Sequence, residues 1–376
     1  MLTPTELVSA AAAIFAVPKS FEAAKAARAA TLDITPVAAV ANAAWRMMYQ
    51  ETSPASEPGA VSPGALALPP PPALTSVVWA ADQVRLFGRR GLVGQGGALF
   101  LGGPVRDAAD LARAVADCAE GAEGLMLRAK SDLAADMLAS YPHGDRRLAG
   151  VGLHVGRPLA VSPRPFMLGQ FAALLLVADL APRLDYVVLA DAHPGLAAIL
   201  SEIGLGHLKI FDLERLQGVQ CAEIFVPQMA EDPAGWVDQA TVARLQRFAA
   251  RAHARLGRGM HADPIKIFLT DTDDNSSPLA SLAVQQGYQL RGLAGRSLID
   301  RALMMAKASI VVTDQAEGTM TTLFAPKHVP VLDLAGGDPM PRALQLAATG
   351  RPYRFALPGQ AEEAIKELLF ETSEAA

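Results

Sequence analysis

The sequence predicts an α/β protein of two domains, and three observations lead to this class. The chain has 376 residues, of which 51% are hydrophobic, so it is too long for one ordinary core and apolar enough to bury two. From Phe166 onward, short apolar runs of strand length alternate with runs of helical length. Such alternation is typical of parallel sheets that are covered by helices on both faces.

The first 75 residues are expected to form a helical arm and a proline-rich linker. Residues 1–50 are alanine-rich with helical spacing, whereas residues 52–74 contain closely spaced prolines, which cannot continue a helix. The apolar run Leu7–Val17 is far shorter than the roughly 20 residues that a membrane span needs, so we expect a buried helix and no membrane span. Such an arm would join two copies into a homo-oligomer, cover a cleft or simply pack, and the sequence leaves these alternatives open.

Residues 76–232 are expected to form the first α/β domain. Short apolar stretches from Val77 to Pro104, separated by glycine-rich turns, predict strands. The later elements predicted here are a helix that begins at Phe166 and ends at Pro182, a strand over 185–190, a helix that begins at Pro194 and a strand over 208–213. The loop 229–238 contains proline and glycine and is the expected domain boundary.

Residues 233–376 are expected to form the second domain, which begins with a long helix over 239–256. Strands are predicted over 265–271, 288–293, 309–314 and 329–334, and helices over 278–286, 297–308 and 317–324. The last predicted helix, 359–370, should pack onto the domain because it places one apolar stripe on a single face. The residues of that stripe are Ala361, Ala364, Ile365, Leu368 and Leu369.

Composition and charge narrow the functional classes. A net charge of −5 argues against nucleic acid or an anionic membrane as the main partner. The two cysteines, Cys118 and Cys221, belong to no Cys-x-x-Cys pair, which argues against a disulfide scaffold or a cysteine zinc site and favours a reducing, cytoplasmic compartment. The seven histidines form no HxxxH or HExxH arrangement, so nothing resembles a histidine-based metal site.

A candidate ligand site lies in the stretch SIVVTDQAEGTMTTLFAP, residues 309–326, where a strand, a polar break and a helix follow one another. Ligands of open α/β sheets sit beyond the carboxyl ends of the strands. Gly318 would let a ligand approach the backbone closely, and Thr319 and Thr321 would supply hydroxyls. The structural alternative is that Thr313 or Asp314 caps the helix and that Gly318 only relieves a tight bend.

A second acidic cluster ends the strand over 265–271 and contains Asp271 and Asp273. Carboxylates at a strand end could hold a divalent cation, Mg²⁺ or Mn²⁺, or could simply be solvated turn residues that cap a helix. Among the basic residues that could face phosphates, Arg296 comes directly before a predicted helix, while Arg183 lies in the first domain. Both would instead be solvated side chains if no ligand binds there.

The segment from Ser297 to Leu334 resembles the C-terminal core of the family 61 glycosyltransferases, a capsular-polysaccharide type. That family has EQ, then an alanine, a strand, HGAGLTN and a phenylalanine. Without gaps, Asp300 and Arg301 take the EQ positions, and Gly318 takes that of the motif's second glycine. Upstream, FAALLLVADLAPRL resembles the family's NYYHWLLDxLPRL, with Asp179 and Arg183 in step.

The resemblance spans about half of the chain, from Phe166 to Leu334. It implies the GT-B fold, in which two Rossmann-like domains face a cleft. The C-terminal domain would hold a nucleotide-sugar donor, and the N-terminal domain would lie on the side of the glycan acceptor. The implied reaction is inverting transfer of a sugar to a polysaccharide or another glycan in the bacterial cytoplasm.

Several polar positions of the family differ here. Gln315 replaces the motif histidine, Glu317 its alanine and Thr321 its asparagine. Glu317 and the nearby Asp314 would repel a diphosphate by about 1 to 4 kcal/mol in a moderately screened site. Asp271-Thr272-Asp273 also resembles the DxD metal signature of the GT-A glycosyltransferases.

Three explanations remain open at this point. A divalent cation held by Asp271 and Asp273 would offset the repulsion. Alternatively, Asp271, Asp314 or Glu317 would deprotonate the acceptor hydroxyl, while Arg296 and the loop from Gln315 to Thr321 hold the diphosphate. In the third explanation catalysis is lost, and the protein is a scaffold or a glycan-binding module. By position in the family motifs, Asp179 and Arg183 are further candidates for substrate binding.

Overall fold

The structure is a computed structural model, and it describes the residues that follow. They are 46–54, 70–87, 92–95, 98–100, 146–155, 167–180, 183–189, 195–212, 219–230, 235–256, 264–273, 277–347, 349–356 and 358–374. Most of the expected arm and Cys118 lie outside these ranges. The chain divides into two compact units, one comprising residues 1–51 and 76–229 and the other 52–75 and 230–376.

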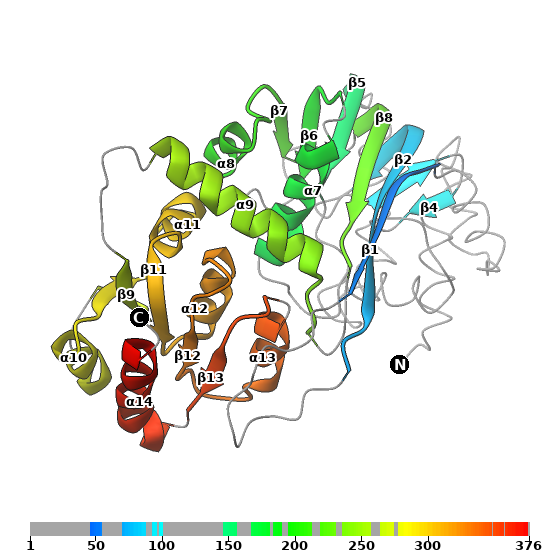
Figure 1. Cartoon of the computed structure of the whole chain (residues 1–376). Coiled ribbons are helices and arrows are strands. Elements are labelled where there is room, and N and C mark those ends of the chain that lie inside the picture. Colours follow the sequence, from blue (N-terminus) through cyan, green and yellow to red (C-terminus); the bar gives the residue numbers. More distant parts are fainter. Residues whose placement is uncertain are drawn as a thin grey trace, which may run out of the picture. The chain divides into compact units, whose positions relative to one another are not determined.

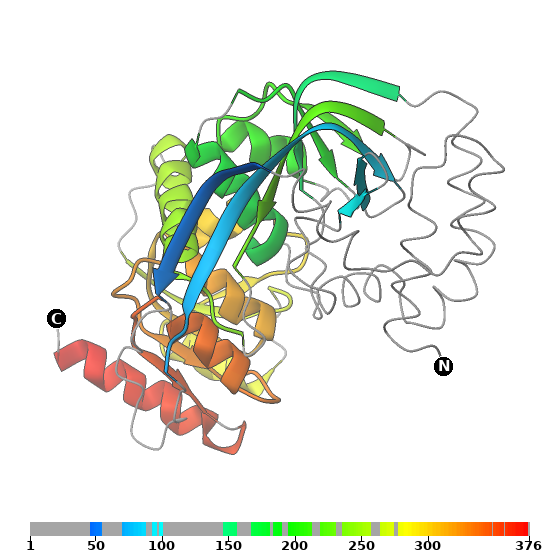
Figure 2. The ribbon, with the colours of Figure 1, turned by 90° about the vertical axis from the view of Figure 1, so that its right-hand side faces the viewer.

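The first unit contains a mixed sheet of eight strands in the order β4-β3-β2-β8-β5-β6-β7, with β1 paired to β2. The strands are β1 (Arg46–Pro54), β2 (Ala73–Phe87), β3 (Leu92–Gln95), β4 (Ala98–Phe100), β5 (Arg146–His154), β6 (Tyr186–Leu189), β7 (Lys209–Asp212) and β8 (Val219–Gln228). Strand β5 pairs in parallel with β6 and β8, whereas β2 is antiparallel to β8 and β3. The long strands β1, β2 and β8 curve side by side (Figure 2). The alternation therefore predicted only part of this sheet.

The helices of the first unit follow the predicted order. A π-helical turn over Met167–Phe171 leads into α7 (Ala172–Leu180), and α8 (Leu196–Glu202) lies between β6 and β7. Almost every residue of the turn and of α7 is buried, as expected for a helix that is apolar all round. The leucines of α7 pack with residues of the strands in one core cluster, which includes Leu153, Val187 and Phe225.

The helical arm and linker expected over residues 1–75 do not extend as far as predicted, because strands occupy part of that range. Residues 46–54 form β1, and residues 73–75 already belong to β2. Strand β1 alternates, because Tyr49 and Ser53 are more buried than the exposed Gln50 and Thr52. The alanine-rich helical spacing ends before Arg46, and a strand pattern takes over.

The second unit contains a five-stranded sheet in the order β10-β9-β11-β12-β13, and all its pairings are parallel. Its strands are β9 (Ile265–Thr270), β10 (Gln289–Gly292), β11 (Ala308–Thr313), β12 (Val331–Asp333) and β13 (Tyr353–Phe355). The prediction of a parallel sheet is confirmed for this unit. The strand β13 was not predicted.

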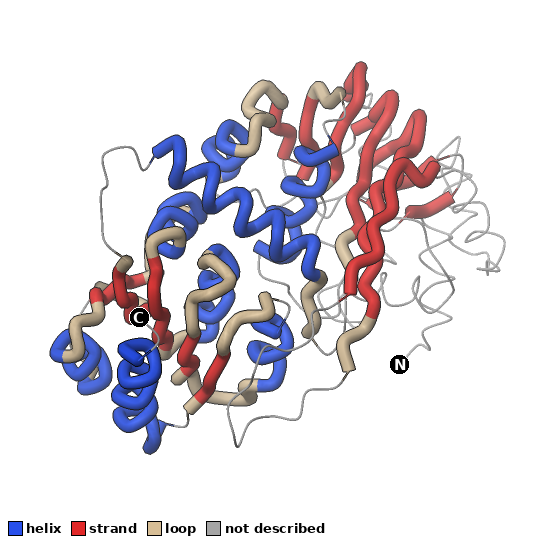
Figure 3. Tube along the Cα trace, viewed as in Figure 1, coloured by secondary structure: helices blue, strands red, loops and turns tan. Residues whose placement is uncertain are grey.

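Helices cover both faces of this sheet (Figures 1 and 3). They are α9 (Gln239–Leu256), α10 (Pro278–Gln285), α11 (Leu298–Met305), α12 (Ala316–Thr321) with a 3-10 turn over Thr322–Phe324, α13 (Met340–Ala347) and α14 (Ala361–Glu374), which follows a 3-10 turn over Pro358–Gln360. The core under α10 and α14 includes Phe268, Ile310 and Leu332. On the other face α12 contacts both α11 and α13, and α9 packs on α11.

Local sequence signals explain where these helices begin. Ser277 accepts a hydrogen bond from the Ala280 N–H at the start of α10, and Ser297 and Asp300 form a reciprocal capping box on α11. In α14 the predicted stripe is confirmed, since Ala361, Ile365 and Leu368 are buried. None of the helices in the described part of the chain is long and apolar enough to cross a membrane.

Candidate functional site

The second sheet reverses its direction of growth between β9 and β11. The chain adds β10 on one side of β9 and then returns to add β11, β12 and β13 on the other side. Helices that leave the two strands at such a switch point go to opposite faces, which opens a crevice at the carboxyl ends. Asp271 follows β9 and Asp314 follows β11, and the Asp314 N–H bonds the carbonyl of Leu269 at 3.3 Å. The topology therefore brings these two predicted carboxylates together.

Asp314 has the most unusual environment among the candidate carboxylates. It is half-buried, and its Oδ1 is inaccessible to solvent without a hydrogen-bond partner among the described residues. Burial raises the pKa of Asp314, and the negative charge of Asp271 raises it further, although a hydrogen bond from Gln315 acts in the opposite direction. A carboxylate with a raised pKa at the carboxyl end of a strand is a candidate proton acceptor.

Glu317 is paired, contrary to the expectation that it repels a diphosphate. Arg301 Nη1 donates to Glu317 Oε1 at 2.5 Å, and Arg301 Nη2 donates to the carbonyl of Leu293 at 2.9 Å. The Arg301 side chain is only 16% exposed, whereas that of Glu317 is 63% exposed. The guanidinium therefore compensates the carboxylate, which removes much of the expected repulsion. Arg301 was not among the predicted site residues, although it stands at a motif position.

Asp273 and Arg296 were predicted as a metal ligand and a phosphate ligand, yet they bind each other. Arg296 Nη2 lies 2.8 Å from Asp273 Oδ2, and the Gly292 N–H donates to Asp273 Oδ1 at 2.6 Å. The hydrogen bond from Gly292 and the ion pair with Arg296 lower the pKa of Asp273. Both oxygens are occupied, so this pair fastens the turn after β9 to the end of β10.

The role expected of Gly318 also changes. A Cβ at Gly318 would overlap Oγ1 of Thr313, so the glycine allows α12 to pack closely on β11 rather than making room for a ligand. Thr313 Oγ1 donates to the Gln315 carbonyl at 3.0 Å and accepts from the Gln315 N–H at 3.2 Å. Thr313 thus shapes the turn, but the expectation that Thr313 or Asp314 caps the helix is wrong, because Gln315 is the N-cap residue and no side chain caps α12.

The threonine hydroxyls of α12 and of the 3-10 turn after it are buried or bonded to backbone carbonyls. Thr321 Oγ1 donates to the Glu317 carbonyl at 3.0 Å, and Thr322 Oγ1 donates to the Thr319 carbonyl at 2.7 Å. Thr319 is fully buried, and its Oγ1 has no hydrogen-bond partner among the described residues. Gln315 and Glu317 are exposed polar side chains of the turn. Because Glu317 is paired with Arg301, Gln315 is the uncharged side chain of the predicted loop that a ligand can reach.

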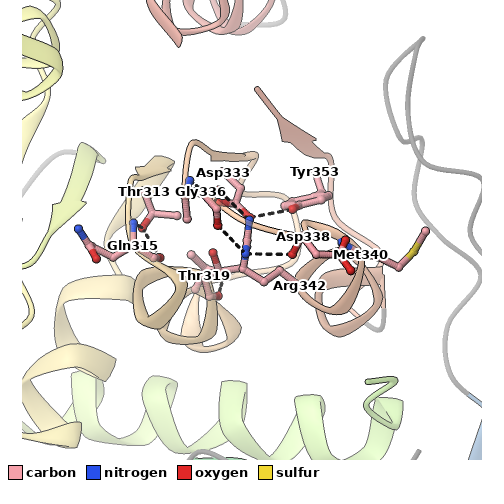
Figure 4. A network of polar contacts seen from close by, with 11 residues as sticks. Thr313, Gln315, Thr319, Asp333, Gly336, Asp338, Met340, Arg342 and Tyr353 are labelled. Atoms are coloured by element: carbon pink, nitrogen blue, oxygen red, sulfur yellow. Dashed lines mark hydrogen bonds and ion pairs between the residues drawn. The ribbon is translucent and has the colours of Figure 1, made fainter. Parts of the chain in front are cut away.

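A polar network that the sequence did not reveal lies at the ends of β12 and β13 (Figure 4). Asp333 is 1% exposed; its Oδ2 accepts from Arg342 Nε at 2.7 Å and from the Tyr353 hydroxyl at 2.9 Å. The other two guanidinium nitrogens of Arg342 donate to backbone carbonyls of Ala335, Gly336 and Asp338. The network holds the loop after β12 beside the turn at Thr313, because Thr313 and Asp333 are partners in neighbouring strands.

Two predicted residues lie in the first unit, away from the carboxyl ends of its strands. Asp179 is exposed near the end of α7, and Arg183 is exposed shortly before β6 begins. At the carboxyl end of β5 stands His154, which is 1% exposed and places Nδ1 at 3.2 Å from the Val188 carbonyl. Its burial favours a structural role. The buried Cys221 has a pKa raised to about 11 by burial, so it is a poor nucleophile.

The metal prediction finds little support in the geometry. Within the part of the chain that the structure describes, no three His, Cys, Asp or Glu side chains gather as a metal site would require. Asp271 and Asp314 could supply two ligands at the switch point, but Asp273 is engaged by Arg296. No protein-family model matches the chain, and no curated protein matches it either.

Proposed function

We propose that this protein is an inverting glycosyltransferase that transfers a sugar from a nucleotide-sugar donor to a glycan acceptor. The proposal rests on the resemblance of residues 166–334 to the family 61 enzymes. The GT-B arrangement, in which two Rossmann-like domains face each other, is part of what we propose. One observation carries it furthest. The half-buried carboxylate of Asp314 stands at the switch point of a parallel sheet, where its N–H bonds the carbonyl of Leu269 and the charge of Asp271 acts on it.

In the proposed reaction Asp314 accepts the proton of an acceptor hydroxyl. The hydroxyl oxygen forms a bond to the anomeric carbon as the bond from that carbon to the diphosphate breaks, and the nucleoside diphosphate leaves with the electron pair. Because the attack comes from the opposite face, the configuration inverts without a covalent intermediate. Burial is the main cause of the raised pKa of Asp314, and the negative charge of Asp271 adds to it. Gln315 is an exposed side chain placed to contact the donor.

Arg301 makes the turn less negative than the sequence indicated, because it pairs with Glu317. Glu317 and Arg301 form a neutral pair at the start of α12, so the diphosphate would meet Asp314 and Asp271 as the remaining carboxylates. A divalent cation between Asp271 and Asp314 would reduce the remaining repulsion, and we include Mg²⁺ or Mn²⁺ as an optional component.

The competing function is a glycan-binding or scaffold protein without catalysis. A specific observation favours it, because side chains predicted to grip the donor are used inside the protein. Arg296 binds Asp273, and the Thr321 hydroxyl binds a helix carbonyl. If the protein is a glycan-binding or scaffold protein, the switch point between β9 and β11 has kept the backbone arrangement of a ligand site, but its side chains no longer bind a donor.

A thermal-shift panel separates the two functions. The full chain is heated with UDP-, GDP-, ADP- and CMP-sugars, each with EDTA, Mg²⁺ or Mn²⁺, and with the sugar alone as control. Stabilisation by one nucleotide class that grows with its concentration supports the glycosyltransferase, since a ligand that binds only the folded state raises the melting temperature. No stabilisation by any nucleotide sugar would favour the binding protein. Release of free nucleoside diphosphate in the presence of glycan acceptors then tests transfer itself.

A further inference from the structure

Three of the arginines in the second unit pair with carboxylates close to the carboxyl ends of its strands. The pairs are Arg296 with Asp273, Arg301 with Glu317 and Arg342 with Asp333. They differ in how firmly the carboxylate is held. Asp333 is fully buried and also accepts from the Tyr353 hydroxyl. Asp273 contacts its arginine through both oxygens and also accepts from the Gly292 N–H.

Glu317 is the most weakly held of the three carboxylates. Among the described residues it accepts one hydrogen bond, from Arg301 Nη1, and its side chain is 63% exposed. An exposed ion pair gains little, because water screens it and because holding a long side chain in one position costs entropy. Glu317 can therefore leave Arg301 at a small cost in free energy.

Arg301, in contrast, is fixed in place. Its side chain is only 16% exposed, and its Nη2 donates to the Leu293 carbonyl at 2.9 Å. Its Nε is buried without a hydrogen-bond partner among the described residues. A guanidinium keeps its charge in a protein, so a mostly buried one requires an anion beside it. Because the carboxylate that reaches Nη1 is exposed, Nη1 lies on the solvent side of the group and is open to an anion that replaces Glu317.

This replaceable pair lies beside the switch point of the sheet. Glu317 follows Asp314 by three positions, and the exposed Gln315 stands between them. Through the Leu293 carbonyl, Arg301 is also joined to the loop that follows β10. An anion at Arg301 would thus lie close to the loops after β10 and β11, where the donor is proposed to bind.

We infer that Glu317 is an internal competitor of the donor: it occupies Arg301 in the free protein, and the diphosphate of the nucleotide sugar displaces it. The inference rests on the proposed function and adds an autoinhibitory contact to the same site. A phosphate group is the stronger partner, because a guanidinium can bind it through two parallel hydrogen bonds, whereas Glu317 makes one. The Arg342 and Arg296 pairs are not replaced in this way, since their carboxylates have further partners.

The test is the binding of inorganic pyrophosphate to the full chain, measured by calorimetry, with sodium sulfate at the same ionic strength as the control for screening. Glu317→Gln removes the charge of the competitor. Glu317→Asp keeps the charge but shortens the side chain by one methylene group, so that it no longer reaches Arg301 Nη1. The exposed Glu363 on α14, changed in the same two ways, is the matched control. Arg301→Gln, alone and combined with Glu317→Gln, completes a double-mutant cycle.

We expect both Glu317 variants to bind pyrophosphate about two- to tenfold more tightly than the wild type, and Arg301→Gln to bind it at least about tenfold more weakly. In the Arg301→Gln background, Glu317→Gln should change binding less than about twofold, because no guanidinium is left to be occupied. Glu317→Asp that binds like the wild type would overturn the inference, since the charge alone would then explain the effect. An equal gain from Glu317→Gln in both backgrounds, or no pyrophosphate binding by the wild type and both Glu317 variants, would overturn it too.

Two readings keep the inference separate from the folding of one variant and from the proposed function. The comparison of Glu317→Asp with Glu317→Gln leaves Arg301 in place, so it holds even if Arg301→Gln fails to fold. The nucleotide-sugar thermal shift is read on the same samples. If a nucleotide sugar stabilises the protein but Glu317→Asp does not strengthen binding, only the displacement falls. If pyrophosphate displaces Glu317 but no nucleotide sugar binds, the proposed function falls and the anion site at Arg301 remains.

Discussion

Arg301 and Glu317 form a hydrogen-bonded ion pair of 2.5 Å that joins α11 to the first turn of α12. The two residues are 16 positions apart and belong to consecutive helices on the same face of the sheet. Arg301 also holds the carbonyl of Leu293 at 2.9 Å, in the loop that follows β10. One guanidinium thus connects the loops after β10 and β11, and it sets the charge of the turn at the switch point.

Changing Glu317 to Gln should strengthen nucleotide-sugar binding about two- to tenfold, because a negative charge is removed and Arg301 keeps its own. Stability should change by less than about 1 kcal/mol, since the Glu317 side chain is 63% exposed. Isothermal titration of the two proteins measures both binding and its salt dependence. The exposed Glu363 on α14, changed to Gln, is the matched control. Binding that weakens tenfold or more would mean that Glu317 itself holds the ligand.

Changing Asp314 to Asn should lower the rate of sugar transfer about 10²- to 10⁴-fold, the usual loss when a general base is removed. Nucleotide-sugar binding should be kept or become tighter, because the amide has the same shape without the charge. Asp271→Asn is the comparison, since the negative charge of Asp271 raises the pKa of Asp314. A smaller rate loss in Asp314→Asn than in Asp271→Asn would transfer the role of base to Asp271.

The pH dependence of stability provides a separate check on Asp314. Its pKa in the folded protein is raised above the ordinary value of 3.8, so the folded state holds this proton more tightly than the unfolded state. As the pH rises through 3.8, the unfolded state ionises first and the wild-type protein loses stability relative to Asp314→Asn. The two melting temperatures should therefore converge at low pH and separate above it, with the variant more stable. Curves that stay parallel across this range contradict a raised pKa.

Gly318→Ala should destabilise the protein by about 1 to 3 kcal/mol, because the added methyl group would overlap Thr313 Oγ1 and force α12 away from β11. Gly336→Ala is a matched control in the neighbouring loop, where an added Cβ meets nothing within 4 Å. Denaturant midpoints of the two variants provide the comparison. If both alanines are tolerated equally, the close packing of α12 on β11 is not what requires the glycine.

Much of the second unit could be predicted because its elements are short and each has a clear signal. Ser277 with Pro278 marks the start of α10, and Ser297 with Asp300 marks that of α11. Strand and helix alternate without interruption from Ile265 to Asp333, which is sufficient to predict a parallel sheet. In the first unit β1 was missed because its alternation directly follows the alanine-rich stretch that predicts a helix. Strand β5 was missed because its partners β6 and β8 lie further along the chain.

The side-chain pairing in the candidate site could not be predicted, because it depends on the order of strands in the sheet. Arg296 and Asp273 are 23 residues apart and meet only because β9 and β10 are neighbours. Asp333 and Tyr353 are 20 residues apart and meet across β12 and β13, the second of which was not predicted. The sequence located the acidic positions at strand ends, but it could not show which of them a guanidinium compensates.

The network around Asp333 leads to the last prediction. Arg342→Leu should destabilise the protein by about 3 to 5 kcal/mol, because it leaves the fully buried carboxylate of Asp333 without its countercharge. Tyr353→Phe removes a single hydrogen bond to the same oxygen and should cost only about 1 kcal/mol. Adding Asp333→Asn to Arg342→Leu should recover part of the loss, since the buried charge disappears with its partner. Melting temperatures of the three variants measure this, and an unrecovered double variant would show that Arg342 stabilises mainly through the carbonyls of the loop after β12.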